Sequence, residues 1–341
     1  MTNYILKDEN AVYHECGFSC DNELFIKLED EAYFITDPRY TIEAKEMVKN
    51  AEVIETPRDL YVVAKKIIKE SKIKKIFYDP SDFTVAQFSK LKQSLKITFK
   101  SAPNFSQKKR IIKSDREIEL LRTAVKLGSE AFDQFANYLQ NEGVGKSEQY
   151  INFEAMRILQ LHGKYDLSFH PITAVDENAA KPHAYASDKI LSSDSLLLVD
   201  AGLKYERFCS DRTRVSELTD DMNFSKIQKF KDAKKQKVYD TVLKAQEASI
   251  KIAKPGVKAS DIDKAGREVI EKAGFGKYFV HSTGHGVGLD IHELPVISKK
   301  SSMIIEENMV FTIEPGIYLP DEFGVRIEDM VLATSNGVEI L

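Results

Sequence analysis

The sequence is poor in the features that mark secreted, membrane-spanning or nucleic-acid-binding proteins. It contains three cysteines, Cys16, Cys20 and Cys209, which cannot all pair with one another. Such sparse cysteine predicts free thiols and a reducing, cytoplasmic setting rather than a disulfide framework. No apolar run approaches the roughly 18 residues that a membrane span needs. The charged first segment, Met1–Asn10, lacks an apolar stretch and predicts no secretory signal.

A basic excess is also missing. The formal net charge is -4 at pH 7, which argues against nucleic acid as a partner. The lysines between positions 231 and 237 are typical of a solvated helix face. What the chain does have is material for a core, because 43% of its 341 residues are apolar. This length predicts one large domain or two ordinary ones.

The first hundred residues have the alternating pattern of a small α/β unit. Strands are expected at 23–28, 32–36 and 76–79, and helices at 41–50, 57–70 and about 83–95, with Pro57 at a first helical position. The segment 101–113, which holds a proline and a basic run, predicts a linker. We therefore expect two domains, residues 1–108 and residues 109–341.

The remainder of the chain contains an approximate internal duplication. Long helices are expected at 115–141 and at about 225–254, and each is followed by a Gly-Val turn. A second helix then follows in each half, at about 147–162 and 260–272, and ends near a glycine. Two such units predict a pseudo-twofold fold in which helices back a curved sheet, with a central cleft where side chains from both halves meet.

Two aspartates, Asp200 and Asp211, are the most informative residues. The apolar run 196–200 ends in the first aspartate, and after a turn the segment 208–215 returns as a partner strand that carries the second. Antiparallel pairing would place both carboxylates on one face, where they repel unless one is protonated. A metal ion between them removes this conflict. The alternative is a pair of ordinary turn and surface aspartates.

Further candidate ligands follow downstream. His285 lies in the segment STGHGVG, whose small residues allow backbone to crowd the imidazole. It belongs to a cluster with His281 and His292, which holds three of the seven histidines of the chain. Glu314 follows the apolar strand-like run 309–313, and Glu328 follows the short segment Val325-Arg326-Ile327. Carboxylates at strand ends beside rigid turns suit metal ligands held by a scaffold.

The charges of this set support a metal centre with two ions. Four carboxylates balance two divalent cations, so the site could be buried without an unpaired charge. Oxygen-rich ligation with one imidazole and no thiolate suits Mn²⁺, with Co²⁺ or Zn²⁺ as alternatives. Two such ions about 3.5–4 Å apart can lower the pKa of a bridging water towards ~7 and polarise a carbonyl. The ligands therefore predict a hydrolase with a metal-activated water as nucleophile.

Five segments then carry a family resemblance. In chain order they are LLLVDAGL, CSDRTRV, HSTGHGVGLDIHE, TIEPGIY and GVRIED, and together they resemble the M24 metallopeptidases of the pita-bread fold. Xaa-Pro aminopeptidases and prolidases are the most similar branch. The N-terminal unit, with FITDPRY, resembles the creatinase-type N-terminal domain. The expected fold class is therefore α/β (α+β), with a small creatinase-type N-terminal domain before a pita-bread catalytic domain of pseudo-twofold symmetry.

The resemblance implies a complete metal-ligand set. Asp200, Asp211, His285, Glu314 and Glu328 would hold two divalent ions, with the first and last of these touching both. Glu314 would also carry a proton from the attacking water to the leaving nitrogen.

The resemblance implies roles for other residues too. His183 would contact the substrate near the scissile bond, and His292 would stabilise the oxyanion. His281 and Arg326 would line the pocket on the proline side, with Tyr318 and Thr213 at pocket or supporting positions. Structural alternatives stay open: His183 as a loop residue, Arg326 as a partner of the acids that follow it, and Tyr318 in the core.

The leading functional prediction is an exopeptidase that releases the N-terminal residue from peptides with proline at the second position. The second is a prolidase restricted to dipeptides, which would differ in the loops that block the cleft beyond the proline. A methionine aminopeptidase is disfavoured because those enzymes resemble the second domain alone. A non-catalytic peptide-binding protein is disfavoured because all five ligands are present. The resemblance also implies a homodimer.

Overall fold

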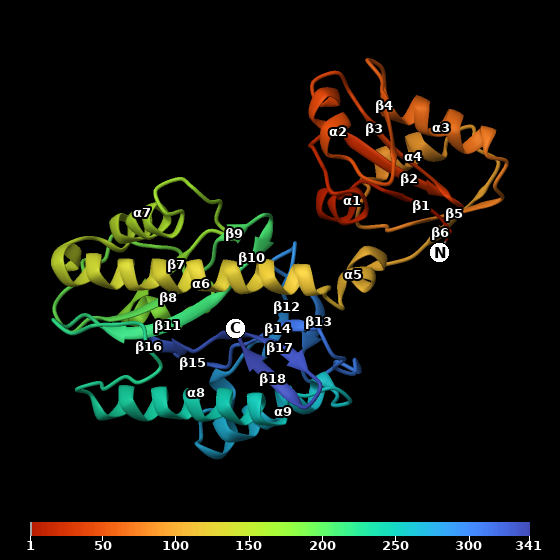
Figure 1. Ribbon diagram of the computed structural model, residues 1–341. Helices are drawn as coiled ribbons and strands as arrows, with labels where there is room; N and C mark the ends of the chain where they lie inside the picture. The colour runs from red at the N-terminus through yellow and green to blue at the C-terminus, as the bar shows by residue number, and fades with distance from the viewer. Residues whose placement is uncertain (1) are drawn as a thin grey trace. The chain divides into compact units, whose positions relative to one another are not determined.

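A computed structural model describes residues 2–341. The chain divides into two compact units, one that ends at Arg110 and one that spans Ile111–Leu341 (Figure 1). Cys16, Cys20 and Cys209 are all buried free thiols, as the sequence predicts. None of the helices formed by residues 2–341 combines the length and hydrophobicity that crossing a bilayer requires.

The first unit is built on a six-stranded mixed sheet in the order β4-β3-β2-β1-β5-β6. Its strands are β1 (Asn3–Leu6), β2 (Glu23–Leu28), β3 (Glu31–Thr36), β4 (Glu52–Glu55), β5 (Lys75–Tyr78) and β6 (Thr98–Ser101), and its helices are α1 (Glu9–Cys16), α2 (Thr41–Met47), α3 (Leu60–Glu70), α4 (Val85–Lys92) and α5 (Phe105–Arg110). Successive residues of β1 face opposite sides: Ile5 packs with α3 and α4, whereas Leu6 packs with α1 and α5. Both faces of the sheet are therefore covered.

The structure refines two sequence expectations for this unit. Pro57 does not begin a helix, because α3 starts at Leu60 with the Asp59 carboxylate accepting the backbone N–H of Tyr61. The expected linker 101–113 contains the boundary between the two units, and it also contains helix α5. Phe105 of α5 is buried, and its backbone N–H donates to the Asp79 carboxylate. In both places an aspartate that supplies a hydrogen-bond acceptor decides the local structure.

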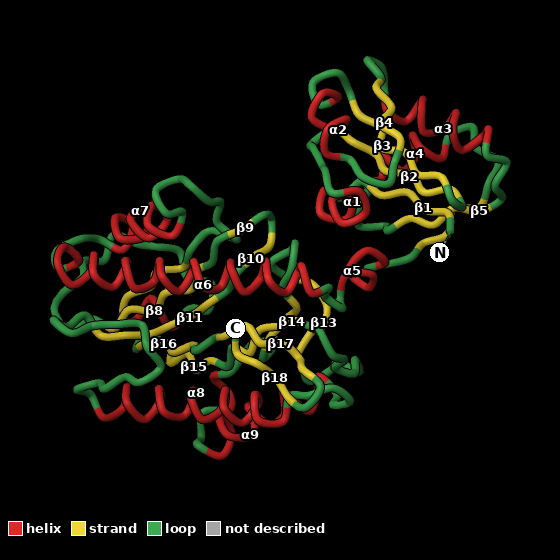
Figure 2. The backbone as a smooth tube through the Cα atoms, in the orientation of Figure 1, coloured by secondary structure: helices red, strands yellow, loops and turns green. Residues whose placement is uncertain are grey.

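The second unit contains the duplicated helices and the inner strands. The first half has α6 (Asp115–Tyr138), a π-turn (Leu139–Gly143), α7 (Glu148–Leu159), β7 (Ile172–Val175), a short 3-10 turn (Asp176–Ala180), β8 (Leu196–Ala201), β9 (Lys204–Tyr205), β10 (Phe208–Cys209) and β11 (Arg212–Glu217). The second half has α8 (Ala233–Ile252), α9 (Ala259–Lys272), a 3-10 turn (Gly276–Tyr278), β12 (Gly284–Gly286), β13 (Glu293–Ile297), β14 (Val310–Ile313), β15 (Gly316–Leu319), β16 (Phe323–Arg326), β17 (Asp329–Thr334) and β18 (Gly337–Ile340). Figure 2 shows strands such as β8, β11, β15 and β16 lying between α6 and α8.

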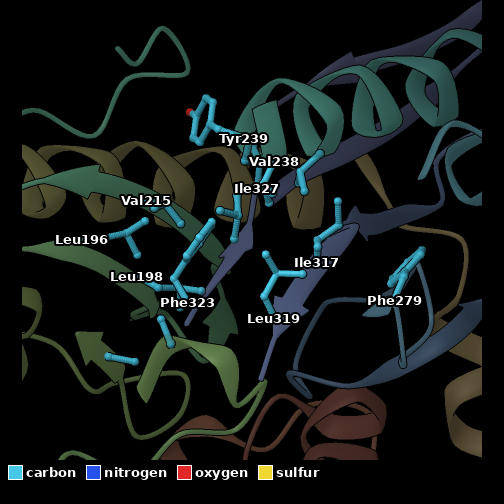
Figure 3. Packing of buried hydrophobic residues seen from close by; sticks show 14 of the residues in the cluster. Leu196, Leu198, Val215, Val238, Tyr239, Phe279, Ile317, Leu319, Phe323 and Ile327 are labelled. Atoms are coloured by element: carbon cyan, nitrogen blue, oxygen red, sulfur yellow. The ribbon is translucent and has the colours of Figure 1, made fainter. Parts of the chain in front are cut away.

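Strand β8 separates two cores. In the three-stranded sheet β11-β8-β7, Val199 faces the cluster under α6 and α7, whereas Leu198 faces the cluster against α8. Figure 3 shows the second cluster, where Leu198 lies among side chains that include Phe323 and Ile327. The next residue on the Leu198 face of β8 is Asp200, so the apolar packing of this strand directs its carboxylate towards the interior.

The second half uses a five-stranded sheet in the order β13-β12-β14-β17-β18. Strand β12 is pressed between β13 and β14, because a Cβ on Gly284 would lie 1.9 Å from the carbonyl oxygen of Thr312. A Cβ on Gly286 would lie 2.1 Å from the carbonyl oxygen of Leu294. The prediction that small residues let backbone crowd His285 is therefore confirmed.

Two expectations for this unit are corrected. The helix expected from about 225 begins at Ala233, because the Asp232 carboxylate caps it by accepting the N–H groups of Lys234 and Lys235. The strand expected at 208–215 is divided: residues 208 and 209 pair with β9, and β11 begins at Arg212 and pairs with β8. The pairing of Thr213 with Asp200 places Asp211 on the same face as Asp200, as predicted.

We expect Leu198→Ala to destabilise the protein by about 2–5 kcal/mol, because the buried side chain is replaced by a cavity between strands and α8. Urea denaturation measures this change. The matched control is Ile227→Ala, since Ile227 is 82% exposed and its loss should change the unfolding free energy by less than about 0.5 kcal/mol. Equal effects of the two substitutions would contradict the assigned core.

Candidate metal centre and active site

The five predicted ligands come from inner strands of both halves. Asp200 lies in β8 and Asp211 immediately precedes β11, while His285 is the middle residue of β12. Glu314 directly follows β14, and Glu328 directly precedes β17. Each side chain is therefore placed by a strand most of whose other residues are buried, so its position depends on the core rather than on a free loop.

One cavity of about 510 Å³ is lined by all five of these residues. Its wall also includes His183, His281, His292 and Arg326. Tyr318 is buried behind the wall, where its hydroxyl is bonded to both His281 and Arg326. The structure thus brings every residue of the predicted site to one cavity or directly behind its wall.

The ligand atoms approach one another closely. Nε2 of His285 lies 3.6 Å from Oδ2 of Asp211 and 3.5 Å from Oε1 of Glu314. Ligand atoms of Asp211, His285 and Glu328 all lie within 4.8 Å of one another. These are separations that a single cation placed between the atoms could bridge.

The hydrogen bonds of His285 leave one ring nitrogen for a cation. Its Nδ1 lies 3.1 Å from the backbone carbonyl of Gly286, and a carbonyl can only accept, so Nδ1 carries the proton. Nε2, which faces the carboxylates, is then unprotonated and carries a lone pair that can bind a cation. Burial lowers the pKa of this imidazole, which favours the neutral form that binds metals.

Two carboxylate oxygens in the cavity have no hydrogen-bond partner among the described residues. They are Oδ1 of Asp200 and Oε1 of Glu328, and both are fully buried. Their sister oxygens are satisfied by Arg326 and by the hydroxyl of Thr213. Buried polar atoms without partners are rare in proteins, so this pair indicates acceptors reserved for a cation.

The electrostatics of the carboxylates give the same indication. Burial, reinforced by the neighbouring carboxylates, holds the pKa of Asp211 and of Glu328 well above their usual range. Burial likewise raises the pKa of Glu314 to about 8. Crowded acids with raised pKa values are poorly stabilised as anions by the protein alone. The donor set therefore fits one or more divalent cations, which would stabilise the charged forms.

Arg326 connects the acids of the first half to the second half. It is 3% exposed, and its Nη2 donates to Oδ2 of Asp200 at 2.6 Å. Its Nε donates to the Thr213 hydroxyl at 3.1 Å, and its Nη1 donates to the Tyr318 hydroxyl at 2.7 Å. The sequence alternative that Arg326 pairs with the acids following it is wrong, because Asp200 takes this role.

The three predicted histidines outside the ligand set have different surroundings. Both nitrogens of His281 are engaged, by the carbonyl of Ser282 and by the hydroxyl of Tyr318, and burial lowers its pKa to about 4. The ring of His292 lies 4.4 Å from that of His285 in an edge-on arrangement. His183 lines the cavity beside Pro182, whose carbonyl accepts from Arg326.

Sequence reasoning missed some of the residues that build this site. His170 lines the cavity just before β7, in the segment FHPI, where a histidine before proline was the available signal. The hydroxyl of Thr312 accepts the backbone N–H of His285 and approaches Glu314 at 3.5 Å. No feature of the sequence pattern distinguishes Thr312 from an ordinary strand threonine.

Comparisons with known proteins agree with this geometry. A family model described as Metallopeptidase family M24 matches residues 119–335, and one for the Creatinase/Prolidase N-terminal domain matches residues 2–118. The chain belongs to metallopeptidase family M24. The predicted family and the predicted fold, a creatinase-type domain before a pita-bread catalytic domain, are confirmed.

Individual relatives of this M24 peptidase cover nearly its whole length. The peptidase YqhT of Bacillus subtilis (strain 168) is 33% identical over 337 residues, which are 98% of this chain and 91% of that protein. An Xaa-Pro dipeptidase from Bacillus anthracis gives a TM-score of 0.90 at 30% identity, over 99% of this chain and 92% of the other. An X-Pro aminopeptidase from Thermotoga maritima MSB8 gives 0.88 at 32% identity, over 100% and 95%.

We expect Thr213→Val to lower the affinity of the M24 peptidase for Mn²⁺ by about 10–100-fold, because Glu328 loses a hydrogen-bond donor and Arg326 loses an acceptor. Titration of the metal-free chain with Mn²⁺ by calorimetry measures the change. Thr241→Val is the control, since that buried hydroxyl bonds to a carbonyl of its own helix. Unchanged Mn²⁺ affinity in Thr213→Val would show that this hydroxyl does not position the ligand.

Proposed function

We propose that this chain hydrolyses the peptide bond between an N-terminal residue and a following proline, as an Xaa-Pro aminopeptidase. The observation that carries the proposal is the convergence of Asp200, Asp211, His285, Glu314 and Glu328 on one cavity. The names of two similar solved structures, an Xaa-Pro dipeptidase and an X-Pro aminopeptidase, support the proline-directed specificity.

The five ligands fit a pair of divalent cations, Mn²⁺ first, with Co²⁺ or Zn²⁺ as alternatives. When bound, such ions would supply an activated water and polarise the scissile carbonyl. The guanidinium of Arg326 adds one positive charge to the four carboxylates. With two dications the buried group would hold a single surplus positive charge, which suits a reaction whose transition state develops an oxyanion.

Glu314 is the residue we assign to proton transfer. Its carboxyl lies at the ligand cluster, 3.5 Å from Nε2 of His285, and burial raises its pKa to about 8. A carboxylate beside the attacking water can take its proton and deliver it to the proline nitrogen, which cannot leave as an anion. The hydroxyl of Thr312 would hold Glu314 in place for both transfers.

His183 and His292 are the residues we assign to the substrate carbonyl. Both line the cavity, and His292 stands edge-on to His285 at the ligand cluster. A ring N–H aimed at the developing oxyanion would stabilise it more than the planar carbonyl of the substrate. His281, with both nitrogens engaged, would shape the wall rather than exchange protons.

The proline side of the pocket is built by a buried network. Arg326 and Tyr318 hold His281 and Asp200 through a continuous chain of hydrogen bonds. Since every nitrogen of Arg326 has a partner, we assign it to positioning these groups. Apolar lining residues, Phe169, Pro171, Ile172, Ile291 and Val296, provide surface for a proline ring and a first side chain.

The charges of the lining favour peptides longer than two residues. A dipeptide substrate carries a carboxylate directly on its proline, which needs a cation nearby. Among the described residues that line the cavity, Arg326 is the only arginine or lysine, and it is committed to Asp200. A neutral peptide bond after the proline suits this wall better.

An Xaa-Pro dipeptidase is the second candidate. The similar structure from Bacillus anthracis carries that name and matches nearly the whole chain. In this case His170 and His183, which line the cavity, would bind the terminal carboxylate of the dipeptide.

The family resemblance also supports a homodimer, which we keep as a proposal, along with a cytoplasmic location.

We expect Asp211→Asn to remove both bound Mn²⁺ and peptidase activity, with kcat/KM falling at least about 100-fold, because a neutral amide cannot balance the cation charge. Metal analysis and an Xaa-Pro peptide assay measure the two effects. Asp321→Asn, on an exposed turn, is the matched control. Near-normal turnover in Asp211→Asn would count decisively against the site.

We expect the Mn²⁺-loaded enzyme to cleave Xaa-Pro tripeptides and longer peptides with a kcat/KM at least equal to that of the Xaa-Pro dipeptide. The corresponding peptides with alanine in place of proline serve as controls for specificity. Cleavage of the dipeptide alone would establish the dipeptidase function instead. Absence of turnover with any divalent metal, beside an active reference enzyme, would refute both functions.

A further inference from the structure

A second cavity, of about 560 Å³, lies on the face of β11 that points away from the metal centre. Thr213 faces the metal centre, so the alternation of a strand turns Arg212 and Arg214 to the other side. The cavity is lined by α6, by this face of β11 and by β17 and β18. We call it the basic cavity because five cationic side chains line it: Arg122, Lys126, Arg212, Arg214 and Lys226.

Most of these cations have acidic partners. Arg214 and Lys226 share the carboxylate of Asp329. Arg122 forms a two-point ion pair with Glu339, which also lines the basic cavity. The acidic side chains that line the basic cavity are Asp329, Glu339 and Asp211. The first two are used in these ion pairs, and Asp211 faces the metal centre.

Arg212 is the exception. Its guanidinium donates to the hydroxyl of Ser129 and to the carbonyl of Phe224, and it lies 5.3 Å from the ring centre of Phe132. Among the described residues, no carboxylate forms an ion pair with it. These contacts hold the side chain in place without a salt bridge. The carboxylates of Asp329 and Asp133 act on its charge only without contact, and burial lowers the pKa of Arg212 to about 10. A buried guanidinium whose charge is stabilised this incompletely favours an anionic ligand.

The two β11 arginines that line the basic cavity each have a donor without an acceptor. The Nε atoms of Arg212 and Arg214 are buried and have no hydrogen-bond partner among the described residues, and Arg214 is only 3% exposed. Buried N–H groups without acceptors are rare, so each indicates a missing acceptor. Lys126, with its side chain 76% exposed, marks the route to solvent.

We propose that the basic cavity binds an oxyanion group of the phosphate type, either free or carried by a small phosphorylated molecule. Guanidinium groups present donors in a planar fork that matches the oxygens of such a group. Arg212 supplies a guanidinium charge without a salt bridge, and Nε of Arg214 supplies a second donor without an acceptor among the described residues. The site is separate from the proposed peptidase reaction and does not depend on it.

The test is calorimetric titration of the metal-free, full-length chain with inorganic phosphate, at ionic strength held constant with chloride. Removing the metals prevents phosphate from binding at the catalytic centre. We expect saturable binding to the parent and at least about tenfold weaker binding to Arg212→Gln, which loses a charged hydrogen bond. Arg116→Gln makes the same charge change at an exposed position of α6 and should bind as the parent does.

A second variant keeps the test decisive if Arg212→Gln does not fold. Ser129→Asp places a tethered carboxylate beside Arg212, so it should retain a melting temperature close to the parent's while losing phosphate binding. Glucose 6-phosphate, titrated in parallel, distinguishes the two sources: tighter binding than phosphate assigns the site to a phosphorylated molecule, and weaker binding assigns it to the free anion.

Three results would overturn the proposal. The first is the absence of saturable binding of either probe to the parent. The second is equal phosphate affinity in the parent and in Arg212→Gln or Ser129→Asp. The third is loss of phosphate binding in His285→Ala, which would place the anion in the catalytic cavity instead.

Discussion

Mutual repulsion among buried carboxylates is the constraint on which this structure depends. Burial, reinforced by neighbouring carboxylates, raises the pKa values of Asp211, Glu314 and Glu328, and Glu328 and Asp200 keep buried oxygens without partners among the described residues. Acids in water would separate, so strong packing must hold them together. The two cores on either side of β8 and the crowded strand β12 supply that packing. A bound cation relieves the repulsion among the carboxylates, and this relief contributes to the affinity of the site for the cation.

Arg326 limits that repulsion before any cation binds. From the end of β16 it reaches Asp200 and Thr213 of the first half, and Tyr318 of the second. The Thr213 hydroxyl in turn donates to Glu328, so one buried network touches ligands from both halves. Removing one partner from such a network leaves the others buried and unpaired, which costs more than the contact itself contributes.

Side chains alternate between the two faces of β11, so one face is acidic and the other is basic. Asp211 and Thr213 face the acidic metal centre, whereas Arg212 and Arg214 face the basic cavity under α6. One extended strand thus separates a cation-binding centre from a surplus of positive charge. A shift of one residue in the register with β8 would exchange these faces and bring arginines to the metal centre.

The sequence by itself determined the family, the two-part organisation and the five residues that meet at the centre, because their motifs are local and their spacing places each at a strand end. Helix ends and short elements depended on single acceptors, such as Asp232 before α8 and Asp79 beside α5, which pattern alone does not reveal. Only the tertiary structure decided that Arg326 pairs with Asp200, that Thr312 supports His285, and that Arg212 is held by a hydroxyl, a carbonyl and an aromatic ring rather than by a salt bridge. Those contacts join buried groups on elements that are distant in the sequence, and a local sequence pattern does not specify which distant groups come into contact.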